Sequence, residues 1–499
     1  MIDLTVAQIA AIVGGELTDI SGADAARLHV TGTVEFDSRK VGSGGLFLAL
    51  PGARADGHDH AAAAVAAGAV AVLAARPVGV PAIVVAPDAQ VTASGAGVLE
   101  HDTDGSGAAV LAALAKLAAA VAAELVAGGL TIIGVTGSSG KTSTKDLLAA
   151  VLAPLGEVIA PPGSFNNELG HPWTVLRATA KTGYLILELS ARHLGNIAAL
   201  AAIAPPAIGV VLNVGTAHLG EFGSREAIAA TNSELPQAVP RSGVVVLNAD
   251  DPAVAAMAEV TAARVVRVSR IEHTDVWAGP VTLDELARPQ FALHSADGIV
   301  DVTLAVHGDH QVSNALCAAA VALECGATLE QVAAALAGAG PVSGHRMRVS
   351  TRADGVTVID DAYNANPDSM RAGLQALAWI SAGSGGDRRR SWAVLGEMAE
   401  LGDDAISEHD RIGRLAVRLD VSRLIVVGTG RSMSAMHHGA VMEGSWGGEA
   451  AIAADADAAL ALLRAELQPG DVVLVKASNA AGLGALADSL AADGRGDPR

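Results

Sequence analysis

Short apolar runs alternate with polar turns over the first 87 residues of the chain. Apolar residues at helical spacing predict helices over Val6–Val13 and Ala61–Ala67. Apolar runs bounded by turn residues predict strands at Leu46–Leu50, Val70–Leu73 and Ile83–Val85. This mixture of short helices and strands indicates a small α/β domain.

A long alanine-rich pattern follows and predicts one helix over Ala108–Val126. The turn-rich stretch Asp102–Gly107 before it places a domain boundary near residue 105. Beyond this helix, strand-like runs alternate with helical patterns up to about residue 342, at Tyr184–Leu189, Ile208–Asn213 and Val244–Leu247. Because parallel strands joined by helices form a layered sheet, we expect a central α/β domain with a mainly parallel sheet.

A second break in composition, Gly338–Gly344, predicts the next domain boundary. Four strand-like runs separated by helical patterns follow it, at Val356–Asp360, Ser391–Leu395, Leu424–Val427 and Val472–Val475. They predict a Rossmann-like third domain. The expected fold class is therefore α/β, in three domains over residues 1–105, 106–342 and 343–499.

The composition narrows the class of protein. The chain of 499 residues carries a net charge of −20, which argues against a nucleic-acid partner because a duplex-binding surface needs a basic face. We expect no membrane span, since the best candidate, Ala108–Leu130, contains Lys116 and Glu124. The first residues contain no basic region followed by an apolar core, so we expect no secretion signal. The two cysteines, Cys317 and Cys325, lie in one helical pattern and too far apart to bridge, so we expect a cytoplasmic protein.

The most informative motif joins an apolar strand to a helix at Thr136–Ser143. Its glycines let backbone N–H groups converge on an anion, Lys141 adds a positive charge, and Thr142 offers a hydroxyl to a magnesium ion. The glycines do not have the spacing of the general G-x-x-x-x-G-K-[ST] loop. The run therefore predicts a compact T-G-x-x-G-K-T phosphate loop, with an ordinary strand-to-helix turn as the alternative.

Two further candidates follow strands of the same predicted sheet. Glu188 ends an apolar strand, where a buried carboxylate is costly unless it meets a cation or hydrogen-bond donors. Magnesium would satisfy it, with Glu188 as an oxygen ligand. His218 follows the next strand and is a candidate for binding or orienting a second metal ion, although a lone loop histidine is more often structural.

Polar residues also crowd a turn of the third domain, Asp360–Met370. Its acids and asparagines can bind ribose hydroxyls and adenine edges, and Pro367 suits the first turn of a helix. A capped turn without a ligand explains the same residues equally well. Arg346, just after the second boundary, adds a fixed cation that can bind phosphate oxygens.

Four runs together resemble the Mur ligases, which are ATP-dependent ligases of cell-wall synthesis related to the folylpolyglutamate synthases. These runs are Thr136–Ser143, Asn213–Gly223, Asp360–Met370 and Val394–Gly402, the last followed by His409. The runs D-A-Y-N-A-N-P and G-E-M-x-E-L-G are similar to those of the family member that adds D-alanyl-D-alanine. Asp37–Arg39 resembles that member's UDP-sugar domain, so the likeness covers nearly the whole chain.

The resemblance implies an ATP-dependent ligase that joins D-alanyl-D-alanine to a UDP-N-acetylmuramoyl tripeptide through an acyl phosphate, for peptidoglycan synthesis. It implies ATP and Mg²⁺ as cofactors, and these small molecules as the partners of a monomeric enzyme. The three domains would bind the UDP-sugar, bind ATP, and close on the nucleotide. No motif indicates whether the third residue of the tripeptide is diaminopimelate or lysine.

The residues that the resemblance implies fall into four groups. The catalytic group is Lys141, Glu188, His218 and Arg346. The nucleotide-binding group is Thr136, Gly137, Ser138, Ser139, Gly140, Lys141, Thr142, Ser143, Asn314, Arg346, Asp361 and Asn364. The metal-binding group is Thr142, Glu188 and His218. The substrate-binding group is Ser38, Arg39, Asn166, Asn167 and Asn366.

One position departs from the family's pattern. Asn232 stands where the family usually has a lysine, whose carbamoylation gives an extra carboxylate for a second magnesium ion. A neutral amide oxygen is a weaker ligand for this hard cation than an anionic carbamate. Either another group, such as Glu234 or water, completes the shell, or the enzyme is weakened or altered. A nucleotide-binding protein without catalysis is therefore one alternative. The other is a sister Mur ligase or a folylpolyglutamate-type ligase, which the runs D-A-Y-N-A-N-P and G-E-M-x-E-L-G disfavour.

Overall fold

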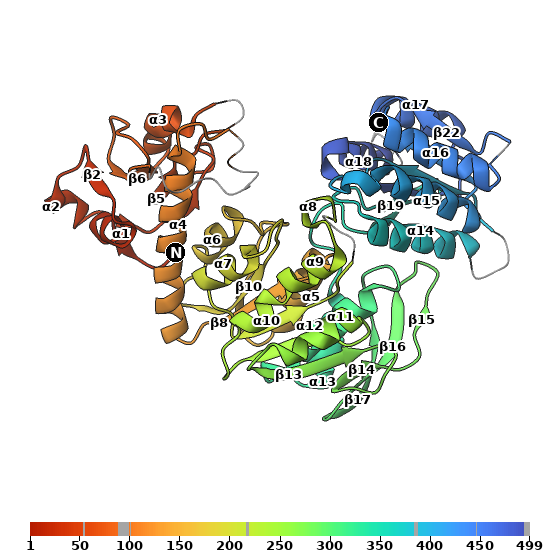
Figure 1. Ribbon diagram of the computed structural model, residues 1–499, viewed down its shortest axis with the longest axis horizontal. Coiled ribbons are helices and arrows are strands. Elements are labelled where there is room, and N and C mark those ends of the chain that lie inside the picture. The colour runs from red at the N-terminus through yellow and green to blue at the C-terminus, as the bar shows by residue number, and fades with distance from the viewer. Residues whose placement is uncertain are drawn as a thin grey trace.

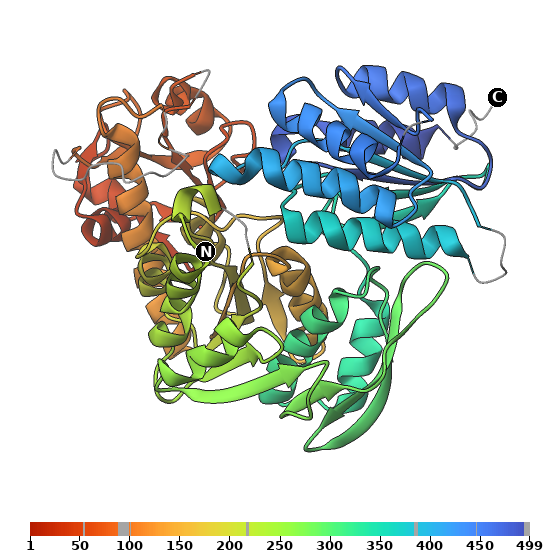
Figure 2. The same cartoon turned by 45° about the vertical axis from the view of Figure 1, so that its right-hand side comes forward.

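The computed structural model describes residues 1–52, 55–87, 99, 101–215, 219–383, 388–445 and 447–493. These residues form three α/β units, each built on its own sheet, with the first and third units above the central one (Figures 1 and 2). The expected three-domain α/β fold is confirmed. The three sheets fall on the expected sides of residues 105 and 342, and we propose 1–105, 106–342 and 343–499 as the domains.

The first domain has a five-stranded sheet in the order β2-β7-β6-β5-β4, in which only β2 is antiparallel to its neighbour. Thr5 and Gln8 form a capping box at the start of its first helix. The helices are α1 (Val6–Val13), α2 (Gly22–Ala25) and α3 (Ala61–Ala66). The strands are β1 (Leu4–Thr5), β2 (Glu16–Thr18), β3 (His29–Val30), β4 (Val34–Glu35), β5 (Gly45–Leu48), β6 (Ala69–Ala74) and β7 (Ala82–Val84). The elements predicted here agree with these bounds to within two residues.

The central domain has a ten-stranded sheet in the order β15-β16-β14-β13-β12-β11-β8-β10-β9, with β17 paired to β16. The strands from β14 to β9 in this order are parallel, whereas β15, β16 and β17 form antiparallel pairs. The first six strands are β8 (Thr131–Thr136), β9 (Glu157–Ile159), β10 (Thr182–Glu188), β11 (Ile208–Val211), β12 (Val244–Asn248) and β13 (Arg264–Ser269). The others, β14 (Val276–Ala278), β15 (Thr282–Leu283), β16 (Pro289–Ser295) and β17 (Gly298–Thr303), form a region that the sequence pattern did not predict.

Helices cover both faces of this sheet, because its buried strands are nearly continuous apolar runs whose successive side chains point to opposite faces. Ile132 belongs to the core on one face and Ile133 to the core on the other. The helices on the first face and around it are α4 (Ser106–Ala127), α6 (Gly170–Val175), α7 (Asn196–Ile203), α8 (Leu219–Phe222), α9 (Arg225–Asn232), α10 (Glu234–Ala238) and α11 (Pro252–Ala255). Those on the second face are α5 (Lys141–Leu152), α12 (Gln311–Glu324) and α13 (Leu329–Gly338).

The third domain has a six-stranded sheet in the order β18-β19-β23-β20-β21-β22, parallel except for β18. Its strands are β18 (Arg348–Thr351), β19 (Thr357–Asp360), β20 (Ser391–Leu395), β21 (Arg423–Val427), β22 (Ala450–Ala453) and β23 (Val472–Lys476). Its helices are α14 (Pro367–Ala382), α15 (Ala405–Arg418), α16 (Arg431–Glu443), α17 (Ala456–Glu466) and α18 (Leu483–Ala492). Two apolar clusters cover the two faces of the sheet, as a Rossmann-like layer arrangement requires.

Helix α4 joins the first domain to the central one. It packs on α1 of the first domain and on α6 and α7 of the central domain (Figure 1). By length and composition it is the one described helix that could cross a membrane, and half of its most apolar window is buried inside the protein. The burial agrees with the packing of α4 on several neighbours, which its small alanine side chains allow.

Candidate functional site

A cavity of about 830 Å³ lies where the carboxyl ends of central strands face the third domain. Thirteen residues that the sequence assigned to the site line it: Ser138, Ser139, Gly140, Lys141, Thr142, Ser143, Asn166, Asn167, Asn314, Arg346, Asp361, Asn364 and Asn366. Thr136 and Gly137 line a smaller adjoining pocket together with Lys141 and Asn232. The fold therefore brings most of the predicted residues to one place.

The phosphate loop requires glycine at two positions. Gly137 has a φ of 145° and Gly140 a φ of 85°, which residues with a side chain rarely adopt. A Cβ atom on Gly140 would lie 2.6 Å from Oδ1 of Asn314, so the loop also packs closely on α12. Helix α5 begins at Lys141, and the unpaired N–H groups of its first turn lie at the cavity. This is the geometry of an anion-binding loop.

Lys141 provides the positive charge of the loop. Its ammonium group donates a hydrogen bond to the carbonyl oxygen of Gly137. Burial lowers the pKa of Lys141 to about 8, although the carboxylate of Glu188 opposes this shift. An anionic ligand beside Lys141 would favour the charged form of its ammonium group.

Glu188 ends strand β10 and is almost completely buried, at 1% exposure. Its Oε2 accepts hydrogen bonds from the hydroxyl groups of Thr142 and Ser164, each at 3.3 Å, and from Nδ2 of Asn166 at 3.4 Å. Burial raises the pKa of the Glu188 carboxyl group, and the positive charge of Lys145 is the main opposing influence.

The second oxygen of Glu188 marks where a metal ion fits. Oε1 is buried and has no hydrogen-bond partner among the described residues. A buried carboxylate oxygen of this kind is stabilised by a cation, and Mg²⁺ prefers carboxylate, hydroxyl and phosphate oxygens. Thr142, whose hydroxyl lies 3.3 Å from Glu188, is the second candidate ligand. The donors present therefore fit magnesium.

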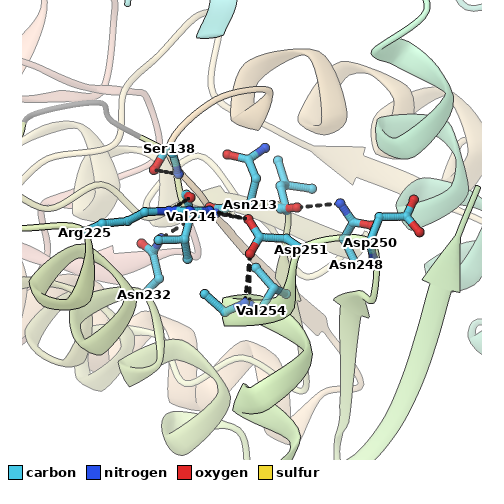
Figure 3. A network of polar contacts seen from close by, with 12 residues as sticks. Ser138, Asn213, Val214, Arg225, Asn232, Asn248, Asp250, Asp251 and Val254 are labelled. Atoms are coloured by element: carbon cyan, nitrogen blue, oxygen red, sulfur yellow. Dashed lines mark hydrogen bonds and ion pairs between the residues drawn. The ribbon is translucent and has the colours of Figure 1, made fainter. Parts of the chain in front are cut away.

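A polar network fixes the segment that follows β11 (Figure 3). The side chain of Asn213 accepts a hydrogen bond from the Ser139 amide at 2.9 Å and donates to the Ser139 carbonyl oxygen at 3.1 Å. Asp251 accepts from the Val214 amide at 2.7 Å, and Arg225 donates to the Val214 carbonyl oxygen at 2.8 Å. This segment therefore holds the phosphate loop in place. His218 lies outside the described residues, so its predicted metal role stays a prediction.

Asn232 lies beside the phosphate loop. It is 6% exposed and accepts a hydrogen bond from the Thr136 hydroxyl at 3.3 Å. Glu234, considered as a replacement ligand, is used elsewhere: its carboxylate accepts hydrogen bonds from the amides of Gly195 and Ala198 at the start of α7. The carboxylate of Glu234 therefore stabilises the start of α7 and does not replace the missing ligand beside Asn232.

The third domain places Arg346 against the phosphate loop. Its Nη2 atom lies 3.3 Å from the Thr142 hydroxyl, and its guanidinium group stacks 4.2 Å from the ring centre of Tyr363. His345 and Met347 on either side have φ values of 55° and 48°, which are strained for residues with side chains. The surrounding contacts hold this strained segment and thereby direct Arg346 into the cavity.

Asp361 forms a buried ion pair that the sequence did not predict. Oδ2 of Asp361 lies 2.5 Å from Nζ of Lys476, and Oδ1 accepts a hydrogen bond from the Met347 amide at 3.1 Å. Lys476 also donates to the carbonyl oxygen of Asn364 at 2.9 Å. Burial lowers the pKa of Lys476, whereas Asp361 opposes this shift. Lys476 lines the cavity and joins the predicted nucleotide-binding residues of this domain.

Asn366 combines a structural role with a place in the cavity. Its side chain and that of Ser369 form a capping box at the start of α14, where Pro367 occupies the first turn. The capped turn that the sequence offered as the alternative is thus present, and Asn364 and Asn366 still line the cavity.

Ser38 and Arg39 do not belong to the residues that line the cavity. Arg39 forms an ion pair with Asp37 at 2.9 Å and holds the pKa of that carboxyl group at about 2. The assignment of Ser38 and Arg39 to substrate binding stays a prediction.

His409 follows the G-E-M-x-E-L-G run, lies in α15 and is buried. Its Nε2 accepts a hydrogen bond from the amide of Met398, which belongs to that run, at 2.9 Å.

Sequence reasoning missed several other cavity residues. They are Ser164, Ser190, Arg192, Arg270 and His310 in loops, Asn248 and Lys476 at the ends of β12 and β23, and Asp368, which lies in the run Asp360–Met370 but was not assigned to the site. The available signal was position alone, because Ser190, Asn248 and Lys476 lie at or just beyond the carboxyl ends of predicted strands.

Three family models match the chain. The Mur ligase middle domain matches residues 135–322, the Mur ligase glutamate ligase domain matches residues 345–479, and the Mur ligase family catalytic domain matches residues 31–121. Together they cover most of the chain and all three units of the fold.

Relatives match over nearly the full length. The UDP-N-acetylmuramoyl-tripeptide--D-alanyl-D-alanine ligase of Mycobacterium tuberculosis is 79% identical over 99% of this chain and 98% of its own. The protein of the same name from Mycobacterium leprae is 74% identical over 99% of each chain, and that from Escherichia coli is 35% identical over 86% of each.

Solved structures agree in fold. A crystal structure of MurF from Acinetobacter baumannii has a TM-score of 0.81 and 29% identity, covering 98% of this chain and 99% of that one. MurF ligase from Thermotoga maritima in complex with ADP has a TM-score of 0.74 and 26% identity, covering 93% and 98%. A phosphate loop and an opposing arginine line one cavity, a buried carboxylate contacts that loop, and the relatives match over nearly the full length, so the chain belongs to the Mur ligase family.

Proposed function

We propose that this protein joins D-alanyl-D-alanine to the terminal carboxylate of UDP-N-acetylmuramoyl tripeptide, using ATP and releasing ADP and phosphate. The product would be the pentapeptide precursor of peptidoglycan. The observation that carries the proposal is the meeting of three groups. The phosphate loop and Arg346 from the third domain line one cavity, and the buried Glu188 accepts a hydrogen bond from Thr142 of that loop.

The chemistry needs activation of a carboxylate, which is a poor acyl donor. In the proposed first step a carboxylate oxygen of the tripeptide attacks the γ-phosphorus of ATP, and the bond to the ADP oxygen breaks. In the second step the amine of D-alanyl-D-alanine attacks the acyl carbon of this acyl phosphate, loses a proton and displaces phosphate. Negative charge spreads over the transferred phosphoryl group, and Lys141 and Arg346 are the cations placed to stabilise it.

The nucleotide would lie with its phosphates on residues 136–143 and its nucleoside end near Asn314, Asp361 and Asn364. Glu188 and Thr142 would hold Mg²⁺, with His218 as the proposed further ligand. The ion would add positive charge at the phosphate oxygens. Because Arg346 and Asp361 come from the third domain, this domain must be closed on the central one for turnover.

The acceptor carboxylate would arrive on the UDP-sugar held by the first domain, with Ser38 and Arg39 as the proposed contacts. Asn166, Asn167 and Asn366 would position the reacting end, since they line the cavity beside the phosphate loop. We further propose a cytoplasmic monomer. Both cysteines are free thiols, and light scattering after size exclusion would test the monomer.

The experiment uses purified protein with ATP, Mg²⁺, UDP-N-acetylmuramoyl tripeptide and D-alanyl-D-alanine, and follows phosphate release while one acceptor at a time is omitted. Release that requires the dipeptide, with the pentapeptide product seen by mass spectrometry, supports the proposal. Release with a single amino acid would indicate a sister ligase. Nucleotide binding without any release would indicate a protein without catalysis, and either result would overturn the proposal.

A further inference from the structure

One loop of the central domain touches both Glu188 and the first domain. It connects β9 to α6 and contains Ser164, Phe165 and Asn166. Ser164 and Asn166 donate hydrogen bonds to Oε2 of Glu188, at 3.3 and 3.4 Å. Phe165, between them, instead packs on aromatic rings outside the cavity. Neighbouring side chains of this loop thus contact two different partners.

The aromatic contact crosses the boundary between domains. The ring of Phe165 lies 4.9 Å from that of Trp173 in α6 and 6.4 Å from that of Phe36, which follows β4 of the first domain. Phe36 and Trp173 meet edge to face at 5.8 Å. Trp173 also donates a hydrogen bond to the Val34 carbonyl oxygen at 2.8 Å. The chain has only five phenylalanines and five tryptophans, so this cluster concentrates a scarce residue type at one junction.

The loop is tied tightly to the elements around it. Asn167 accepts hydrogen bonds from the Gly170 amide through its side chain and from the His171 amide through its carbonyl oxygen, both at 2.9 Å. A Cβ atom on Gly170 would lie 2.7 Å from the backbone of Phe165, so the loop rests directly on α6. The Ser190 amide donates to the Asn166 carbonyl oxygen at 3.2 Å. A displacement of Phe165 must therefore also move Ser164 and Asn166.

Phe36 lies directly before Asp37–Arg39, the segment assigned to the UDP-sugar. We propose that Phe165 is a positioning residue that couples the place of the first domain, and so the UDP-sugar bound there, to the carboxylate of Glu188. The inference rests on the proposed function, because it takes the UDP-sugar as the ligand of the first domain. The position of the first domain determines the position of Phe165. Ser164 and Asn166 move with Phe165 and thereby orient Glu188 for the metal-bound nucleotide.

Two ligands that favour the same arrangement must each tighten the binding of the other by the same factor. Calorimetry would measure Kd of a non-hydrolysable ATP analogue with Mg²⁺, with and without saturating UDP-N-acetylmuramoyl tripeptide. In the unmodified protein we expect the tripeptide to tighten analogue binding at least about fivefold, at the lower end of typical couplings. Phe165→Ala should reduce this factor to below about twofold, while the affinity for the analogue alone changes little.

Three further variants make the test specific. Phe36→Leu leaves the loop itself unchanged and should also weaken the coupling. It replaces Phe165→Ala in the test if that variant does not fold. Phe165→Tyr keeps the ring and should preserve the coupling. Trp277→Ala is the matched control, because it removes a half-buried ring of the central domain that stacks between His273 and His294 and does not touch the loop.

The outcomes separate this inference from the function on which it rests. Binding of both ligands with no coupling in the unmodified protein would overturn the inference alone, as would full coupling in Phe165→Ala. Failure of the unmodified protein to bind the UDP-linked tripeptide would overturn the proposed function and the inference with it.

Discussion

Lys141 gives the nucleotide site a dependence on pH. Burial lowers its pKa to about 8, so above that pH the free protein increasingly holds Lys141 neutral. ADP binding favours the charged form and must then draw a proton onto the lysine. We therefore expect Kd for ADP to be nearly constant below about pH 7 and to rise toward tenfold per pH unit above about pH 8. Calorimetry from pH 6.5 to 9.5 would measure this.

The control for this pH dependence is Lys141→Met, which keeps the length of the side chain and removes the charge. It should bind ADP more weakly at neutral pH and lack the rise in Kd above pH 8. A rise that persists in Lys141→Met would assign the titration to another group.

Asn232 stands where the resemblance to the Mur ligases implies a carbamoylated lysine at the metal site. It is buried beside the phosphate loop, where a carbamoylated lysine would add a negative charge near the phosphates. We predict that Asn232→Lys raises turnover at fixed ATP and magnesium concentrations, measured by phosphate release. Unchanged or lower turnover with an intact fold would count against the metal-shell argument. Asn232→Met, which fills similar space without an amine, should not raise turnover.

Among the elements, the junction of β8 and α5 depends on the lack of a side chain at Gly140. Gly140→Ala would combine a strained φ of 85° with a Cβ atom 2.6 Å from Oδ1 of Asn314, so it should displace Asn314 from the nucleotide. We expect Kd for ADP to rise more than about tenfold, which corresponds to about 1.4 kcal/mol. Calorimetry at one pH would check this.

Gly129→Ala is the matched control for Gly140→Ala. Gly129 has a comparable φ of 105° and no atom within 4 Å of its would-be Cβ, so it carries similar strain without the contact. Equal loss of ADP affinity in both variants would show that strain alone, and not displacement of Asn314, is responsible.

The predictability of the elements follows how local their signals are. Ser391–Leu395 is β20 with the bounds predicted from sequence, because apolar residues fill this buried strand from Trp392 to Leu395. The region from β14 to β17 was missed, since its antiparallel strands are short or carry polar residues such as His294 and Asp301. A short strand with polar residues on one exposed face gives a weak pattern in a single sequence.

The same reasoning explains which site residues could be predicted. Lys141 and Thr142 belong to a contiguous motif, so the chain order alone identifies them. Lys476 meets Asp361 across 115 residues, and only the parallel pairing of β19 with β23 brings the two together. The use of Glu234 at the start of α7 likewise depends on tertiary packing that no local pattern encodes.

At the scale of the whole molecule, the linker to the third domain is fastened to the helix that starts at the phosphate loop. Nζ of Lys145 donates to the Ser343 hydroxyl at 3.1 Å, and Asp146 accepts from the Ser343 amide at 3.0 Å. Ser343 lies only three residues before Arg346. These two contacts therefore tie the start of the third domain to α5, three residues before Arg346.

A second contact between these domains lies at α8 and sets how closely they approach. The Gly220 amide donates to the Glu400 carbonyl oxygen at 3.2 Å, and Arg192 pairs with the Glu400 carboxylate at 3.2 Å. A Cβ atom on Gly220 would lie 2.5 Å from the backbone nitrogen of Gly402, which leaves no room for a side chain. The exposed Arg192–Glu400 pair contributes little by itself, so the backbone contact is the stronger constraint.

Gly220→Ala should therefore hold the central and third domains slightly apart. We expect kcat for phosphate release to fall roughly 10- to 100-fold, because a displacement of about 1 Å at the reacting groups costs that much. The melting temperature should change little, and small-angle scattering with ADP and magnesium should give a larger radius of gyration than for the unmodified protein. Gly223→Ala, at a φ of 74° with nothing within 4 Å, is the control and should keep kcat. An unchanged kcat in Gly220→Ala would show that catalysis does not need this closed contact.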